Sequence, residues 1–168
     1  LTYNNQSYEL GCNRWADDSI APSGQLLIQS FELQGSVPCW RYACGDALLD
    51  KRIWMEYGQN TTYVSYTLVA GSGSASLSSK TVVDNRVFHN TGQINIPDSV
   101  NTDGTHAQIN WKDPDSPSLI LGLSSGKITA ASDIFRNYQL TAEVYRGLRS
   151  ADDHAHAATF NTTLSIGD

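Results

Sequence analysis

The sequence from Lys51 to Ala70 reads KRIWMEYGQNTTYVSYTLVA and decides the fold. Side chains of different character alternate in its first part, which places Ile53 and Met55 on one face of an extended strand. Its second part is rich in β-branched and aromatic residues, which favour strands. The polar sequence Gly58-Gln59-Asn60 between the two parts is typical of a turn. We therefore predict an antiparallel hairpin, with these side chains mainly in the core: Ile53, Met55, Val64, Tyr66 and Leu68.

Most of the remaining chain shows the same pattern of short extended segments separated by turn residues. Many short strands at close spacing indicate an all-β fold, an antiparallel β-sandwich or barrel. Only residues 130–137 are compatible with a helical turn. Because no repeat or linker divides the chain, we expect a single β-sandwich domain over residues 1–168. The chain opens in strand-like sequence without Met, so we expect a fragment of a larger protein.

Composition excludes several classes of partner. A net charge of −6 with scattered Lys and Arg argues against nucleic acid, because phosphate binding needs clustered positive charge. No apolar stretch approaches the ~20 residues that span a bilayer, so we expect no membrane partner. The low, odd count of three cysteines favours a reducing compartment, and hence the cytoplasm, with secretion as the alternative. We expect Cys12, Cys39 and Cys44 to be small buried hydrophobic residues, and a disulfide from Cys12 stays open.

Acidic pairs at Asp17-Asp18 and Asp152-Asp153 invite comparison with glycosidases, in which two carboxylates flank the bond that is cleaved. Adjacent residues on a strand point to opposite faces, however, so solvated turn residues are the favoured interpretation. His154 and His156 would share one face of a strand beside these acids, as metal ligands can. No Cys, His or Glu with supporting spacing completes such a set. We therefore expect no catalytic residue, no metal and no cofactor.

Exposed aromatic residues could instead bind a sugar ring by stacking. Trp15, beside acidic residues in a polar loop, is the first candidate, and Trp111, followed by Lys112-Asp113, is the second. A structural role is the favoured interpretation for each, because most aromatic residues of a sandwich fill or cover its core.

Several short motifs occur in a familiar order. They are Ser30-Phe31, Pro38-x-Trp40-x-Tyr42, Leu49-x-Lys51-Arg52-Ile53-x-Met55, Gly58-x-Asn60-Thr61-Thr62 and Val64-x-Tyr66-x-Leu68, then Arg86-Val87-Phe88-His89, and finally Arg136-Asn137-Tyr138, Glu143, Arg146-Gly147-Leu148, Asp152-Asp153 and Phe160. Together they make the chain resemble the N-terminal domain of bacterial-type glycogen debranching enzymes. These are amylo-α-1,6-glucosidases of the six-hairpin glycosidase group.

This resemblance implies a β-supersandwich that precedes an (α/α)6 barrel carrying the catalytic carboxylates. The chain would then be a non-catalytic accessory domain, with the barrel of its parent chain as partner and an α-glucan oligosaccharide as ligand. The alternatives are a free-standing carbohydrate-binding module and, less favoured, a self-contained hydrolase. Arg86 and His89 could donate to sugar hydroxyls, or could form a satisfied pair at a strand end. We expect Trp15, Arg86 and His89 to lie near the surface that faces the barrel or its substrate.

Overall fold

The computed structural model describes residues 1–86 and 94–167, which form an all-β structure of antiparallel sheets with one short α-helix. The predicted fold class is confirmed. Contacts group the chain into two compact units. The first unit contains Leu1–Cys12, Pro22–Leu77 and Thr163–Asp168, and the second contains Asn13–Ala21 and Ser78–Thr162. That the whole chain is a single domain stays a prediction.

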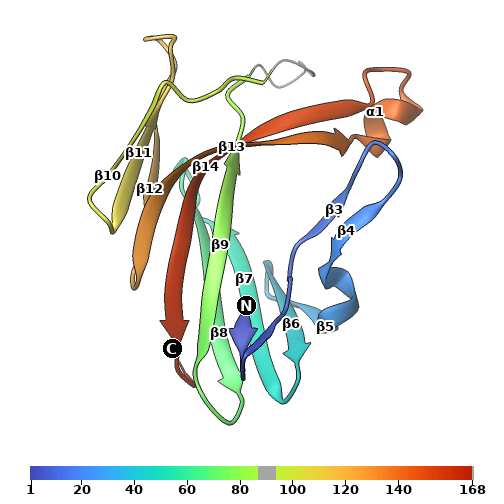
Figure 1. The fold of residues 1–168 in the computed structure, drawn as a ribbon, viewed down its shortest axis with the longest axis vertical. Helices are drawn as coiled ribbons and strands as arrows, with labels where there is room; N and C mark the ends of the chain where they lie inside the picture. The colour runs from blue at the N-terminus through green and yellow to red at the C-terminus, as the bar shows by residue number, and fades with distance from the viewer. Residues whose placement is uncertain (87–93, 168) are drawn as a thin grey trace. The chain divides into compact units, whose positions relative to one another are not determined.

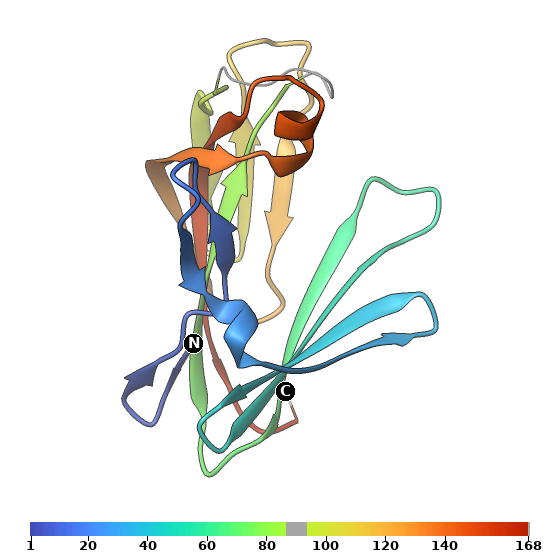
Figure 2. The same cartoon turned by 90° about the vertical axis from the view of Figure 1, so that its right-hand side faces the viewer.

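A four-stranded sheet belongs entirely to the first unit. Its strands, in spatial order, are β5 (Ile28–Gln34), β6 (Val37–Cys44), β7 (Ala47–Met55) and β8 (Thr62–Ala70). Each strand pairs antiparallel with the next, so the sheet is a meander of three consecutive hairpins, which can be followed in Figure 2. A short 3-10 helix, η1 (Gly24–Leu27), precedes β5.

A five-stranded sheet contains residues of both units, and its strands β9 and β14 are long (Figure 1). The spatial order is β13 (Lys127–Gln139), β14 (Ala151–Leu164), β9 (Ala75–Val83), β1 (Thr2–Tyr3) and β2 (Gln6–Ser7). A three-stranded sheet of the second unit comprises β10 (Ser99–Thr102), β11 (His106–Asn110) and β12 (Leu119–Gly122). The remaining elements are the pair β3 (Cys12–Arg14) and β4 (Ile20–Ser23), and the helix α1 (Thr141–Tyr145).

Each unit has its own hydrophobic core between two layers. In the first unit, Leu49 and Leu68 of the four-stranded sheet pack in one cluster with Tyr3, Leu77 and Leu164 of the five-stranded sheet. In the second unit, Ile109 of β11 packs in one cluster with side chains of β9 and β14, namely Val83, Ala155 and Ala157. Side chains from facing sheets thus fill both cores, as in a β-sandwich.

The predicted hairpin is present, because β7 and β8 pair antiparallel from Leu48 to Met55. Leu68 is fully buried, as expected, whereas Ile53 and Tyr66 are only partly buried. The prediction of core positions is wrong for Met55 and Val64, which are 63% and 51% exposed. Alternation keeps them on the same face as Leu68, but the buried cluster that covers this face ends short of them.

Two further expectations need correction. Residues 130–137 belong to strand β13, because they pair with β14 across two irregularities, and the helical turn lies beyond them at α1. The cysteines Cys39 and Cys44 are buried, but Cys12 is exposed at the start of the short pair β3–β4, and all three are free thiols. Within the described ranges, no helix is long and apolar enough to cross a membrane.

Leu68 and Leu33 provide a test of the core, because both are leucines on the four-stranded sheet. Leu68 is 0% exposed and Leu33 is 63% exposed. We expect Leu68→Ala to lower the free energy of unfolding by about 2–5 kcal/mol, since it removes buried methyl groups and leaves a cavity. Leu33→Ala should change it by under about 1 kcal/mol. Urea denaturation measures both, and equal effects would contradict the assignment of the core.

Candidate functional site

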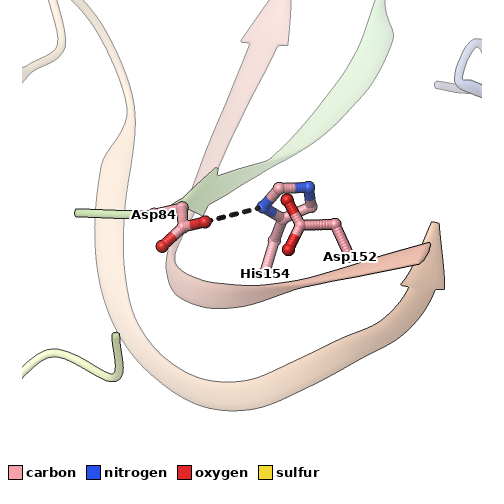
Figure 3. Close-up of side chains that lie close together, drawn as sticks. All are labelled: Asp84, Asp152 and His154. Atoms are coloured by element: carbon pink, nitrogen blue, oxygen red, sulfur yellow. Dashed lines mark ion pairs between the residues drawn. The ribbon is translucent and has the colours of Figure 1, made fainter. Parts of the chain in front are cut away.

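A cluster of charged side chains lies where β9 ends beside β14 (Figure 3). Arg86 Nε lies 3.0 Å from Asp84 Oδ2, and Arg86 Nη1 contacts Asp152 Oδ2. His154 Nδ1 lies 3.8 Å from the same Asp84 oxygen. The side chains of Asp84 and Asp152 are only 8% and 0% exposed. The Arg86 guanidinium therefore bridges two buried carboxylates, and we call these four residues the charged cluster.

Local backbone structure explains how the cluster forms. Residues 152 and 154 are separated by one position on β14, so their side chains leave the strand on the same face. Asp84 and Arg86 follow directly after Val83, the last residue of β9, where the chain is free to turn both side chains toward β14. Buried charges are stable only when they are paired, and the guanidinium provides this pairing.

Burial raises the pKa of the Asp84 carboxyl above its usual value. Arg86 and His154 oppose this shift, whereas the negative charge of Asp152 adds to it. Two carboxylates thus share one guanidinium, and the cluster holds one negative charge more than positive charge when His154 is neutral.

The ligand atoms of Asp84, Asp152 and His154 lie within 4.8 Å of one another, and this set could hold a metal ion. Arg86 contacts both carboxylates, however, and already supplies the positive charge that a metal would bring. Sequence reasoning missed Asp84 as a neighbour of Asp152, because Asp84 lies just past the end of β9 and Asp152 lies on β14, far away in the sequence. His156 stands apart from the set, since its ring nitrogens contact Asp133 (3.2 Å) and Thr159 (2.9 Å).

A series of tilted ring contacts leads from Trp15 to the charged cluster. The Trp15 ring centroid lies 4.7 Å from that of Tyr138, which lies 4.9 Å from that of His154. The Trp15 indole N–H donates to the Ala21 carbonyl (2.7 Å), which fixes the ring in its loop. The structure therefore connects Trp15 with Arg86 through neighbouring side chains. His89, the third residue expected here, lies outside the described residues.

Asp17 and Asp18 lie in an exposed turn, as expected. The interpretation as solvated turn residues is wrong for Asp152 and Asp153, because their segment forms strand β14, on which Asp152 is fully buried. Asp17 accepts hydrogen bonds from the N–H and the hydroxyl of Ser19, which lower its pKa. Asp18 accepts from Gln139. Asp153 contacts Arg136 (3.0 Å) and accepts from the backbone N–H of Asn137 (2.8 Å).

Trp111, the second aromatic candidate, is partly buried and packs against the core of the second unit. This contact matches the structural interpretation of Trp111. A role in sugar binding stays a prediction for Trp15, Trp111, Arg86 and His89 alike.

A second notable surface lies on one face of the four-stranded sheet, and we call it the apolar face. It consists of Phe31, Leu33, Trp40, Ile53, Met55, Val64 and Tyr66, around Lys51. The rings of Phe31 and Trp40 are in tilted contact, with centroids 5.3 Å apart. The Lys51 amine lies over the rings of Trp40 (5.7 Å) and Tyr66 (5.9 Å), and burial lowers its pKa. Four members of the face are exposed, namely Phe31, Leu33, Met55 and Val64.

Comparison with known proteins identifies the family. The sequence model of the family described as "Glycogen debranching enzyme N terminal" matches residues 1–168. The chain belongs to this family. No curated protein and no solved structure matches it.

Two groups of the motif residues that suggested the debranching-enzyme family have a defined place in this N-terminal domain. Many of those between Phe31 and Leu68 lie on one side of the four-stranded sheet. This side begins with the buried residues Leu49 and Leu68 and continues as the apolar face. Arg86 and Asp152 meet in the charged cluster.

Arg86→Met tests the charged cluster, because it leaves two buried carboxylates without their counter-charge. We expect a loss of about 3–5 kcal/mol in the free energy of unfolding. The matched change Arg136→Met breaks an ion pair whose arginine is mostly exposed and should cost at most about 1 kcal/mol. Chemical denaturation near neutral pH measures both. Adding Asp84→Asn to Arg86→Met should recover part of the loss, and no recovery would contradict the proposed ion pairing.

Proposed function

We propose that this chain is a non-catalytic accessory domain of an α-glucan debranching glycoside hydrolase, which packs on a catalytic (α/α)6 barrel and helps to shape substrate binding. Membership of the debranching-enzyme family supports the parent activity. The observation that carries the docking role is the exposed part of the apolar face.

Exposed apolar side chains are common singly, but a contiguous group of them is typical of an interaction surface. Here Met55 and Val64 lie on the neighbouring strands β7 and β8, Leu33 lies on β5 across β6, and all three are more than half exposed. Covering such side chains stabilises a complex by roughly 25 cal/mol per Å² of apolar area removed from water. A flat apolar sheet face suits packing against helices, which a barrel of helices offers.

The motifs themselves support this interpretation. Tyr42, Leu49 and Leu68 pack in the core of the first unit, so the stability of the fold explains why they belong to the motifs. Phe31, Met55 and Val64 are also in the motifs, yet they lie outside that buried cluster. Packing against a second protein surface in the parent enzyme would explain why these three apolar residues belong to the motifs.

In the same proposal, Trp15, Arg86 and His89 lie on the side of the domain that meets the barrel or its substrate. The ion pairs of Arg86 support a positioning role for it, because two of its nitrogens already contact carboxylates. A cytoplasmic location belongs to this proposal as well, since glycogen debranching enzymes act on a cell's glycogen store.

Docking is tested with Val64→Glu, using the (α/α)6 region of the parent enzyme expressed separately. A carboxylate placed at the interface loses its hydration, so we expect at least tenfold weaker binding by calorimetry. Ser65→Glu adds the same charge one residue away, on the opposite face of the sheet, and should leave binding unchanged. Equal effects of the two substitutions would refute docking through the apolar face.

The proposal also predicts that the purified chain releases no glucose from glycogen, limit dextrin or panose, because the catalytic carboxylates belong to the barrel. Glucose release is measured with a coupled enzymatic assay, with the parent enzyme as positive control. Turnover by the chain that disappears in Asp152→Asn or Asp153→Asn would establish the alternative of a self-contained hydrolase.

A free-standing carbohydrate-binding module is the second candidate function. The observation that favours it is an exposed, stacked aromatic pair, Trp54 and Tyr63, on the four-stranded sheet.

A further inference from the structure

The face of the four-stranded sheet opposite the apolar face is polar and carries one exposed aromatic pair. Strand alternation brings charged, amide and hydroxyl groups to this side, together with Trp54 and Tyr63. We call it the polar face and define it by Glu32, Gln34, Arg52, Trp54, Tyr63 and Ser65.

Trp54 and Tyr63 are direct partners across β7 and β8. Their rings are nearly parallel, at 13°, with centroids 5.3 Å apart. Direct overlap of two rings would bring their planes to about 3.5–4 Å, so a separation of 5.3 Å means that the rings are offset. Offset stacking leaves part of each facing surface uncovered. The two residues are 38% and 41% exposed, so aromatic surface remains available to a ligand.

Hydrogen-bonding groups surround the pair. In the adjacent cross-strand row, Glu32 and Arg52 lie on either side of Cys39, and Ser65 pairs with Arg52. The Gln34 amide donates to Glu32 (2.7 Å), which holds these two polar side chains together. Donors and acceptors of both charge signs are therefore present within two rows of the sheet.

This combination fits a neutral, polyhydroxylated ligand. A sugar ring has an apolar C–H face that packs on aromatic rings and hydroxyl groups that pair with donors and acceptors. Polyanionic ligands are disfavoured, because Glu32 is part of the face and the chain carries a net charge of −6.

We propose that the polar face binds α-glucan through the Trp54–Tyr63 pair. The choice of ligand rests on the proposed role in a debranching enzyme. Docking on the barrel uses the opposite face, so each of the two proposals can fail without the other.

The test follows the indole N–H signals of the four tryptophans by NMR while maltoheptaose is added to the 168-residue chain. We expect the Trp54 signal to shift in a saturable manner, with those of Trp15, Trp40 and Trp111 unchanged. A shift confined to Trp15 or Trp111 would move the sugar site to the candidates named from the sequence and overturn the proposal. No shift of the Trp54 signal would overturn it as well.

Substitutions then separate binding from a purely structural role of the pair. Trp54→Ala and Tyr63→Ala should each weaken maltoheptaose binding at least fivefold in glycogen affinity electrophoresis and in titration. Tyr57→Ala removes a fully exposed tyrosine of the same hairpin and should have no effect. Because Trp54→Ala could loosen the hairpin, Glu32→Gln with Arg52→Gln alters only the polar groups and should also weaken binding. Unchanged binding in both the aromatic and the polar variants would refute the proposal.

Discussion

The pairing of Leu49 with Leu68 across β7 and β8 sets the register on which much of the first unit depends. Both side chains are fully buried, so a slip by one residue would move them to the opposite face and expose them. The same register assigns every other side chain of the hairpin to a face. Lys51, Ile53 and Met55 therefore share the side of Leu49, and Arg52 and Trp54 take the other.

Two surfaces of different chemistry follow from this one constraint. The side that begins in the core continues as the apolar face, which suits another protein surface. The other side combines aromatic rings with charged and amide groups, which suits a sugar. In the two proposals, one side of this sheet packs on the catalytic barrel and the other binds α-glucan, so the two contacts do not compete for the same face.

In the charged cluster of the second unit, ion pairs stabilise charged groups that are buried. The charged groups of Asp84, Asp152 and Arg86 are shielded from water, which is unfavourable unless each one is paired with an opposite charge. Their ion pairs join the end of β9 to β14. The tilted ring contacts of Trp15, Tyr138 and His154 extend this link to the loop between β3 and β4. The cluster is therefore both a structural link within its unit and the place where two family motifs meet.

Local pattern was enough to predict the all-β class and the β7–β8 hairpin, because alternation and turn residues act between neighbours in the chain. The family came instead from the resemblance of the motifs. Local pattern also assigned Asp17 and Asp18 correctly to an exposed turn, but it could not show that Asp152 and Asp153 lie on β14. Local pattern could not show that Met55 and Val64 are exposed, because burial depends on whether another layer covers that part of the sheet. Nor could it reveal Asp84 as the partner of Arg86 and a neighbour of Asp152, or the stacking of Tyr63 on Trp54. These contacts depend on which strands become neighbours and in which register, and only the packing of the whole chain decides that.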